Sequence, residues 1–223
     1  MRQLNSVGRF SALGHFVTRQ VGKVVPPAVK ARIITARPTA GSVSQAAWNR
    51  GYESGEWDYL AGAQELGRYS VIASLCRHFA PRGRVLDVGC GSGLLAPWLL
   101  DAGVSRYLGV DLSEVAIEQA RRTHPDRAEF AVADASTFVS AQKFDAIVFN
   151  ELLYYLEKPE ADVLRFSRVL APGGVIIVSM WHHTDGLRTW DRLRPHFDEL
   201  DRVQVTHDPS HLKWDVAVLR PRP

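Results

Sequence analysis

A glycine-rich turn is the feature of this sequence most directly suited to binding a ligand. Residues 84 to 88 have the pattern of a buried strand, and Gly89, Gly91 and Gly93 follow that strand at once. Because glycine lacks a Cβ, the backbone of such a turn can approach a ligand closely, and the helix expected behind it offers free N–H donors. Leu94 stands where the dinucleotide-binding fingerprint has its third glycine. The turn therefore predicts a nucleotide-type ligand other than a dinucleotide.

Two acidic residues follow later strands and are candidates for binding other parts of the same ligand. Asp111 ends an apolar segment at 106–110, and a carboxylate at the end of such a strand can accept both hydroxyls of a ribose. Asp134 follows another predicted strand at 128–132. The sequence around Asp134 is also typical of a turn or a helix N-cap, because Asp and the nearby Ser136 satisfy free N–H groups in loops. Both interpretations of Asp134 stay open on sequence alone.

The motifs VLDVGCGSG and GVDLS, in this order and at this spacing, resemble those of the class I S-adenosylmethionine-dependent methyltransferases over residues 68 to 220. The resemblance implies that Asp87 orders the glycine turn and helps to hold the methionine part of the cofactor. It also implies that Asp111 binds the ribose and that Asp134 receives the adenine amino group. The residues expected to bind S-adenosylmethionine are Asp87, Gly89, Cys90, Gly91, Gly93, Asp111, Leu112, Asp134, Ala135 and Asn150.

Strand-like and helix-like segments alternate through most of the chain, which predicts a doubly wound α/β fold with a mostly parallel, seven-stranded sheet. The last two strands have a short connection, so they are expected to form a C-terminal antiparallel hairpin, as in the Rossmann-like fold of these methyltransferases. We expect a basic, partly helical N-terminal arm over residues 1–50 and a methyltransferase domain over 51–223. The resemblance implies that residues 51–60 form part of a lid over the cofactor and substrate. The predicted strands are 84–88, 106–110, 128–132, 144–149, 175–180, 200–206 and 214–219, and the predicted helices are 65–79, 93–102, 113–123, 160–170 and 187–197.

Candidate catalytic residues follow the fourth and fifth strands, because the ligand crevice of an open α/β sheet lies beyond the carboxyl ends of its strands. Methyl transfer needs an acceptor held in line and, for a hydroxyl or ammonium acceptor, a base. Glu151, Tyr154 and His182 are expected to act on the acceptor. Alternatively, Glu151 caps a helix or only hydrogen-bonds the ligand. Tyr154 could equally be a residue of the hydrophobic core. Adjacent histidines such as His182 and His183 can bind a metal ion, but no group of carboxylates lies at the sequence spacing expected of further metal ligands. No metal site is therefore expected.

The first fifty-two residues contain eight Lys or Arg and no Asp or Glu, although the whole chain has a net charge of only +3. Apolar residues recur at helical spacing from Val7 to Val24, before Pro26 and Pro27. Such an arm suits contact with an anionic membrane, a lid on the domain, a mobile segment or an organellar targeting peptide. No apolar run is long enough to span a bilayer, and the two cysteines form no C-x-x-C pair. A cytoplasmic protein, peripheral to a membrane at most, is expected.

The resemblance implies an enzyme that transfers a methyl group from S-adenosylmethionine to an oxygen or nitrogen of a small molecule. The segments 68–70, 150–156 and 179–181 look like those of bacterial enzymes that act on sugars, glycolipids or secondary metabolites. An NAD-dependent oxidoreductase is an alternative, although the missing third glycine argues against it. A nucleic-acid methyltransferase is another, suggested by the basic arm. The loop after 144–149 lacks the Asn-Pro-Pro-aromatic arrangement of DNA amino-methylating enzymes, so no specific nucleic-acid partner is expected. A binding subunit without turnover is the last alternative.

Overall fold

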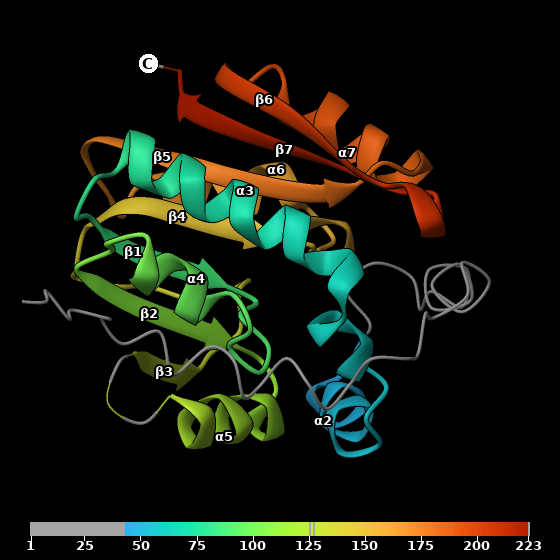
Figure 1. Ribbon diagram of the computed structural model, residues 1–223. Helices are drawn as coiled ribbons and strands as arrows, with labels where there is room; N and C mark the ends of the chain where they lie inside the picture. The colour runs from blue at the N-terminus through green and yellow to red at the C-terminus, as the bar shows by residue number, and fades with distance from the viewer. Residues whose placement is uncertain (1–42, 125, 127, 223) are drawn as a thin grey trace, which may run out of the picture.

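The computed structural model describes residues 43 to 222 apart from 125 and 127, so the helix predicted in the basic arm lies outside the described residues. The fold is built on one sheet of seven strands: β1 (Arg84–Val88), β2 (Arg106–Asp111), β3 (Glu129–Val132), β4 (Phe144–Asn150), β5 (Leu170–Trp181), β6 (Phe197–His207) and β7 (Leu212–Pro221). Their order across the sheet is β3-β2-β1-β4-β5-β7-β6 (Figure 1). The first five strands pair in parallel, and β7 runs antiparallel to both β5 and β6. The predicted doubly wound sheet with its C-terminal antiparallel hairpin is confirmed.

Helices cover both faces of this sheet (Figure 1). One face carries α3 (Ala63–Phe79), α4 (Ala96–Asp101) and α5 (Glu114–Thr123), and the other carries α6 (Pro159–Ser167) and α7 (Thr184–Leu193), with the short helices η3 (Leu153–Tyr155) and η4 (Asp208–Ser210) in loops. Neighbouring residues of a strand enter opposite cores, since Val85 packs on the α3 side and Leu86 on the α6 side. Burial on both faces explains why the central strands are continuous apolar runs in the sequence.

All five predicted helices differ from the structure by one to four residues at one or both ends, and two of these differences have a clear physical reason. α4 begins at Ala96 rather than Gly93, because Gly93 has a φ of +79° and cannot belong to an α-helix. The free N–H donors of this helix therefore do not follow the glycines directly. α7 ends at Leu193 rather than Phe197, because Pro195 follows closely and cannot continue a helix.

A roof, defined here as α2 (Gln45–Glu53) and η2 (Asp58–Ala61), lies at the carboxyl ends of the parallel strands, where α2 packs beside α5 (Figure 1). Ser44 caps α2, since its hydroxyl accepts a hydrogen bond from the N–H of Ala47. α2 runs across residue 50, so the division of the chain at that residue stays a prediction. In the part of the chain that the structure describes, no helix is long and apolar enough to cross a membrane.

Candidate functional site

A cavity of about 460 Å³ lies between the roof and the carboxyl ends of β1, β2 and β4, and this volume is typical of small-molecule sites. The strand order reverses between β1 and β4, which is where open α/β sheets bind their ligands. A smaller cavity of about 60 Å³ shares Tyr52, Gly89 and Asn150 with it. The two cavities together form one candidate site.

Most of the residues predicted to bind a cofactor line these cavities. Cys90 and Gly91 line the smaller cavity, whereas Asp87 and Gly93 are not among the lining residues of either. The larger cavity is lined by Gly89, Asp111, Leu112, Asp134, Ala135 and Asn150. The structure thus brings the glycine turn and the carboxyl ends of β2, β3 and β4 to one place. The binding role of each residue stays a prediction.

The glycine turn has a backbone conformation that other residues rarely adopt. φ is +73° at Gly89, +55° at Gly91 and +79° at Gly93. A Cβ on Gly91 would lie 2.5 Å from the hydroxyl oxygen of Tyr52, and one on Gly89 would lie 2.9 Å from Leu152. The turn therefore has no room for side chains at these two positions, and the roof packs on it through Tyr52.

Asp111 connects the end of β2 to the glycine turn and also lines the cavity. One carboxylate oxygen accepts a hydrogen bond from the N–H of Gly91 at 2.9 Å, and the other accepts one from the N–H of Ser113 at 2.8 Å. Burial raises the pKa of Asp111, and these backbone hydrogen bonds oppose that shift. Each oxygen keeps a second lone pair, so Asp111 can still accept a ligand hydroxyl.

Asp87 is buried behind the glycine turn, with 1% of its surface exposed. Its Oδ2 accepts a hydrogen bond from the Tyr107 hydroxyl at 2.7 Å. Burial raises the pKa of Asp87 to about 7, although the Tyr107 hydrogen bond acts in the opposite direction. Within the described part of the chain, Oδ1 has no hydrogen-bond partner. Because a buried carboxylate oxygen without a partner is costly, a ligand or water donor is expected to complete this site.

The loop after β3 contains the turn that its sequence allows. Oδ1 of Asp134 accepts a hydrogen bond from the N–H of Ser136 at 2.7 Å, which confirms the turn interpretation. Asp134 nevertheless lines the cavity and is exposed to it, so the two interpretations are compatible. Arg165 of α6 holds this loop by donating hydrogen bonds to the carbonyl oxygens of Ala135 and Phe138.

Arg68 of α3 is a charged residue of the site that the sequence analysis missed. It is 1% exposed, lines the smaller cavity, and donates hydrogen bonds to Glu65 at 2.5 Å and to the side chain of Asn150. Burial acts to lower the pKa of Arg68, but Glu65, Tyr69 and Glu151 together outweigh burial, and the pKa is raised. The signal available in the sequence was a Glu and an Arg three residues apart on a predicted helix.

Glu151 and Tyr154, two of the predicted catalytic residues, meet at the larger cavity. The Tyr154 hydroxyl donates a hydrogen bond to Oε2 of Glu151 at 2.7 Å, and both residues line the cavity. Burial and the nearby Glu151 carboxylate raise the pKa of Tyr154, so the phenol keeps its proton and remains a donor. Glu151 has a φ of +62°, in the left-handed region that is uncommon for a residue with a long side chain. Backbone strain of this kind is concentrated at functional sites.

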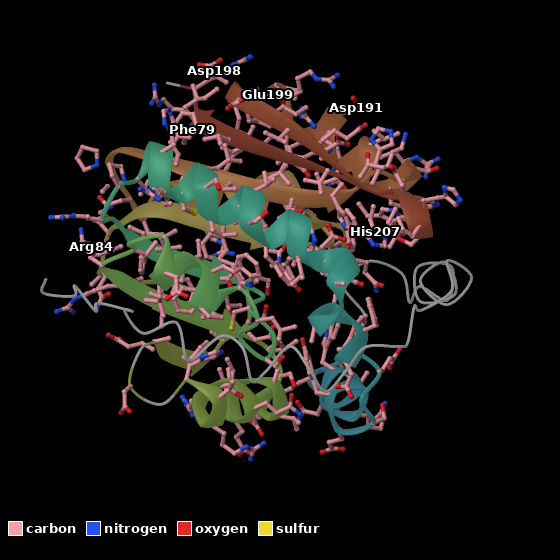
Figure 2. All side chains as sticks on the ribbon, viewed as in Figure 1. Phe79, Arg84, Asp191, Asp198, Glu199 and His207 are labelled. Carbon is pink, nitrogen blue, oxygen red and sulfur yellow. The ribbon has the colours of Figure 1, made fainter. Side chains whose placement is uncertain are left out.

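His182, the third predicted catalytic residue, lies beyond the end of β5 and is not among the residues lining either cavity. Its Nδ1 lies 2.6 Å from Oδ2 of Asp215 on β7, and Gln204 donates to the same carboxylate at 3.2 Å. Figure 2 shows His207 at this end of the hairpin. The structure therefore does not bring His182 to the other two predicted catalytic residues. Across residues 43–222, with the two gaps named above, no cluster of His, Cys, Asp or Glu could hold a metal ion.

Aromatic side chains form much of the remaining wall of the larger cavity. The rings of Trp48 and Trp57 have centroids 5.3 Å apart, and Trp48 meets Tyr155 edge-on at 5.1 Å. Tyr52 and Tyr59 also line the cavity from the roof. The predicted lid segment 51–60 thus lies over the site, whereas the contribution of Trp48 had no signal in the sequence analysis.

The chain is similar to a known methyltransferase and to a nodulation protein over most of this domain. A malonyl-(acyl-carrier protein) O-methyltransferase of Hahella chejuensis is 35% identical over 151 residues, which cover 61% of this chain and 53% of the relative. Nodulation protein S of Rhizobium tropici is 30% identical over 146 residues, covering 60% of this chain and 61% of the relative. The chain thus spans only part of the length of these relatives.

The solved structures include a fold of the same kind. The N-methyltransferase NodS from Bradyrhizobium japonicum WM9, in complex with S-adenosyl-l-homocysteine, has a TM-score of 0.67 at 22% identity, covering 79% of this chain and 99% of that one. At this identity the likeness shows the fold. A family model described as a methyltransferase domain matches residues 63–217. Because that match covers more than half of the sequence, the chain belongs to the methyltransferase domain family, as its glycine turn and the motif after it predicted.

Proposed function

We propose that this chain is an S-adenosylmethionine-dependent methyltransferase acting on an oxygen or nitrogen of a small molecule. The observation that carries the proposal is the cavity at the switch point between β1 and β4, where the glycine turn meets Asp111 and Asp134. Family membership supports the reaction class. The relatives named above are described as an O-methyltransferase and, for the solved structure, as an N-methyltransferase, so they support both kinds of acceptor atom.

The residues present fit this cofactor. The glycine turn allows close approach to the backbone, and Asp111 keeps lone pairs for the ribose hydroxyls. We assign the adenine side to Asp134 and Ala135, and the amino-acid part to the smaller cavity beside Arg68.

Glu151 is the residue we assign as the base for the acceptor. When bound, S-adenosylmethionine supplies a methyl group on a sulfonium, whose sulfur is a good leaving group. Glu151 lines the cavity, and Tyr154 positions its carboxylate through the 2.7 Å hydrogen bond to Oε2. We do not assign this role to His182, because it does not line the cavity.

Calorimetry with S-adenosylhomocysteine, and separately with NAD, tests the proposal. We expect S-adenosylhomocysteine to bind, and Asp111→Asn to weaken that binding by on the order of 1 to 3 kcal/mol through lost charge-assisted hydrogen bonds. Asp198→Asn, an exposed acid at the far end of β6, is the matched control and should keep full affinity. Binding of NAD in place of S-adenosylhomocysteine would reject the proposal in favour of an oxidoreductase.

Glu151→Gln tests the assignment of the base. The amide can still accept the Tyr154 hydrogen bond but cannot take a proton, so turnover should fall by roughly 100-fold to 10,000-fold. Affinity for S-adenosylhomocysteine should stay within about twofold in the same calorimeter. His182→Gln should keep most of the turnover. A large loss in His182→Gln with none in Glu151→Gln would exchange the two assignments.

We propose in addition that residues 1–40 contact an anionic membrane surface. These residues lie outside the described part of the chain, so the support is their sequence, which is basic, free of acids and apolar at helical spacing. Sedimentation with phosphatidylserine vesicles, with and without residues 1–40, tests the contact. Equal sedimentation of the two chains would reject it and leave the interpretations of the arm as a lid, a mobile segment or a targeting peptide.

A further inference from the structure

The larger cavity is lined by more acidic than basic side chains. Among the described residues that line it, the one cation is Lys158, which is exposed to solvent. Asp162 is compensated by an ion pair with Arg165 at 3.1 Å. The acidic lining residues are Asp111, Asp134, Glu151, Glu157 and Asp162. The electrostatic field of such a cavity favours a cationic or neutral ligand over an anion.

The smaller cavity does not offer an uncommitted cation to an acceptor. Arg68 lines it, but the guanidinium is already bound by Glu65 at 2.5 Å and by Asn150. Its remaining capacity is assigned above to the amino-acid part of the cofactor. The nearest cation to Glu151 in this cavity is thus already shared with Glu65, Asn150 and the proposed cofactor. An anionic acceptor beside Glu151 would add a negative charge that this shared cation compensates poorly, and burial of a poorly paired charge is expensive.

Aromatic side chains from the roof and from the loop after β4 meet where they line the cavity. Trp48, Trp57 and Tyr155 form one continuous group, with ring centroids 5.3 Å and 5.1 Å apart. The ring centroid of Tyr154 lies 4.8 Å from that of Tyr155, and the Tyr154 hydroxyl donates a hydrogen bond to Glu151. Tyr154 therefore connects this aromatic group to the carboxylate. A carboxylate beside several aromatic rings is the combination that binds organic ammonium groups, through charge pairing and cation–π attraction.

We propose that the methyl acceptor is an amine on an apolar or ring-shaped body, bound as the ammonium between Glu151 and the aromatic group of Trp48, Trp57 and Tyr155. This inference rests on the proposed function, because it takes the cavity as the site of methyl transfer. Asp111 and Asp134 serve the cofactor in that proposal, Asp162 is paired with Arg165, and Glu157 is exposed to solvent. We therefore assign the acceptor to Glu151.

The reaction that follows is balanced without any further reactant. The ammonium gives one proton to the Glu151 carboxylate, which frees the nitrogen lone pair. The nitrogen then forms a bond to the methyl carbon while the electron pair of the carbon–sulfur bond passes to sulfur. The positive charge moves from sulfur to the methylated nitrogen, and the proton on Glu151 leaves to solvent.

Binding of three probes that share one ring and differ in charge tests the inference. Phenethylamine, phenethyl alcohol and hydrocinnamate are titrated by calorimetry into protein saturated with S-adenosylhomocysteine, which carries no sulfonium. We expect the amine to bind about tenfold more tightly than the carboxylate, with the alcohol between them. No binding of the amine, or equal or tighter binding of the carboxylate, would overturn the inference.

Single-residue variants then test which side chains produce the preference for the amine over the carboxylate. Glu151→Gln should reduce the ratio of amine to carboxylate affinity to about twofold, and Trp57→Leu should weaken the amine about fivefold by removing an aromatic face. Glu53→Gln is the matched control, because Glu53 is an exposed acid of α2 that does not line the cavity. An unchanged ratio in Glu151→Gln would mean that this carboxylate does not recognise the ammonium, and the inference would fail.

The saturation step separates this inference from the function on which it rests. A chain that fails to bind S-adenosylhomocysteine contradicts the proposed methyltransferase itself. A chain that binds S-adenosylhomocysteine but prefers hydrocinnamate remains a methyltransferase candidate with an anionic acceptor, and only the amine is rejected. Transfer of a labelled methyl group to phenethylamine but not to phenethyl alcohol would further support the nitrogen acceptor.

Discussion

The two sides of the cavity are held together by different means. On the strand side, the Asp111 carboxylate binds backbone N–H groups of its own loop and of the glycine turn at 2.8 and 2.9 Å. On the roof side, α2 is attached to the loop after β2 through side chains. Gln45 donates to the carbonyl oxygen of Leu112 at 2.8 Å, and Ser113 donates to Asn49 at 2.8 Å.

This difference suits a division of binding in which the strand side holds the cofactor and the roof side holds the methyl acceptor. The strand side presents a ligand with backbone positions fixed by the sheet, which suits a cofactor of constant shape. The roof side presents aromatic rings on a short helix with few attachments, which suits an acceptor that must enter and leave. The predictions below test whether the strand side is the more costly of the two to disturb.

The largest effect is expected from the buried carboxyl of Asp87. Between about pH 4 and 7 this group is ionised in the unfolded chain but still protonated in the folded protein, whose pKa is raised to about 7. The folded state then binds more protons, so the free energy of unfolding falls as the pH rises through this window. The loss is complete once the pH has risen through the folded pKa of about 7, and it is on the order of 4 kcal/mol. Asp87→Asn should remove this slope in urea unfolding curves measured without ligand.

Tyr107→Phe is the companion variant for this test. The Tyr107 hydroxyl stabilises the ionised carboxyl, so its loss should raise the pKa further and extend the falling slope above pH 7. An Asp87→Asn protein with the same dependence on pH as the original chain would show that the buried carboxyl does not limit stability on the strand side.

The strand side could be predicted from the sequence because its parts are local. β1 has the limits predicted, and the glycine turn follows it without a gap, so Gly89, Gly91 and their neighbours needed no knowledge of distant contacts. Asp111 was found because parallel strands end at one edge of a sheet. Glu151 and Tyr154 were placed together by the same rule, since one short loop after β4 carries both.

Other contacts of the candidate site depend on which strands pair and in what register, and a short stretch of sequence does not predict this. The hydrogen bond from Tyr107 to Asp87 requires the register of β1 against β2, which the sequence does not specify residue by residue. The position of His182 depends in the same way on β7, because the Asp215 carboxylate that it meets comes from a strand antiparallel to its own. Sequence reasoning placed His182 after the correct strand but could not assign the side to which it turns.

An intermediate effect is expected from Gly91→Ala, which disturbs the contact between the two sides. Alanine would be strained at a φ of +55°, and its Cβ would lie 2.5 Å from the Tyr52 hydroxyl oxygen. We expect a loss of about 2 kcal/mol in the free energy of unfolding and at least tenfold weaker binding of S-adenosylhomocysteine. Gly103→Ala is the matched control, because φ there is +96° but nothing lies within 4 Å of the added Cβ. Equal S-adenosylhomocysteine affinity in both variants would contradict the close packing of the roof on the turn.

The smallest effect is expected from Gln45→Ala, which removes one attachment of the roof and leaves the strand side intact. Loss of the hydrogen bond to Leu112 should cost about 1 kcal/mol locally. Hydrogen exchange of the α2 amides should therefore become about fivefold faster, while the amides of β1 and β2 keep their protection. Gln204→Ala removes a side-chain hydrogen bond of the C-terminal hairpin instead and should leave α2 unchanged. If β1 and β2 lost protection together with α2, the roof and the strands would open as one unit, and the division between a fixed cofactor side and a separately moving acceptor side would be wrong.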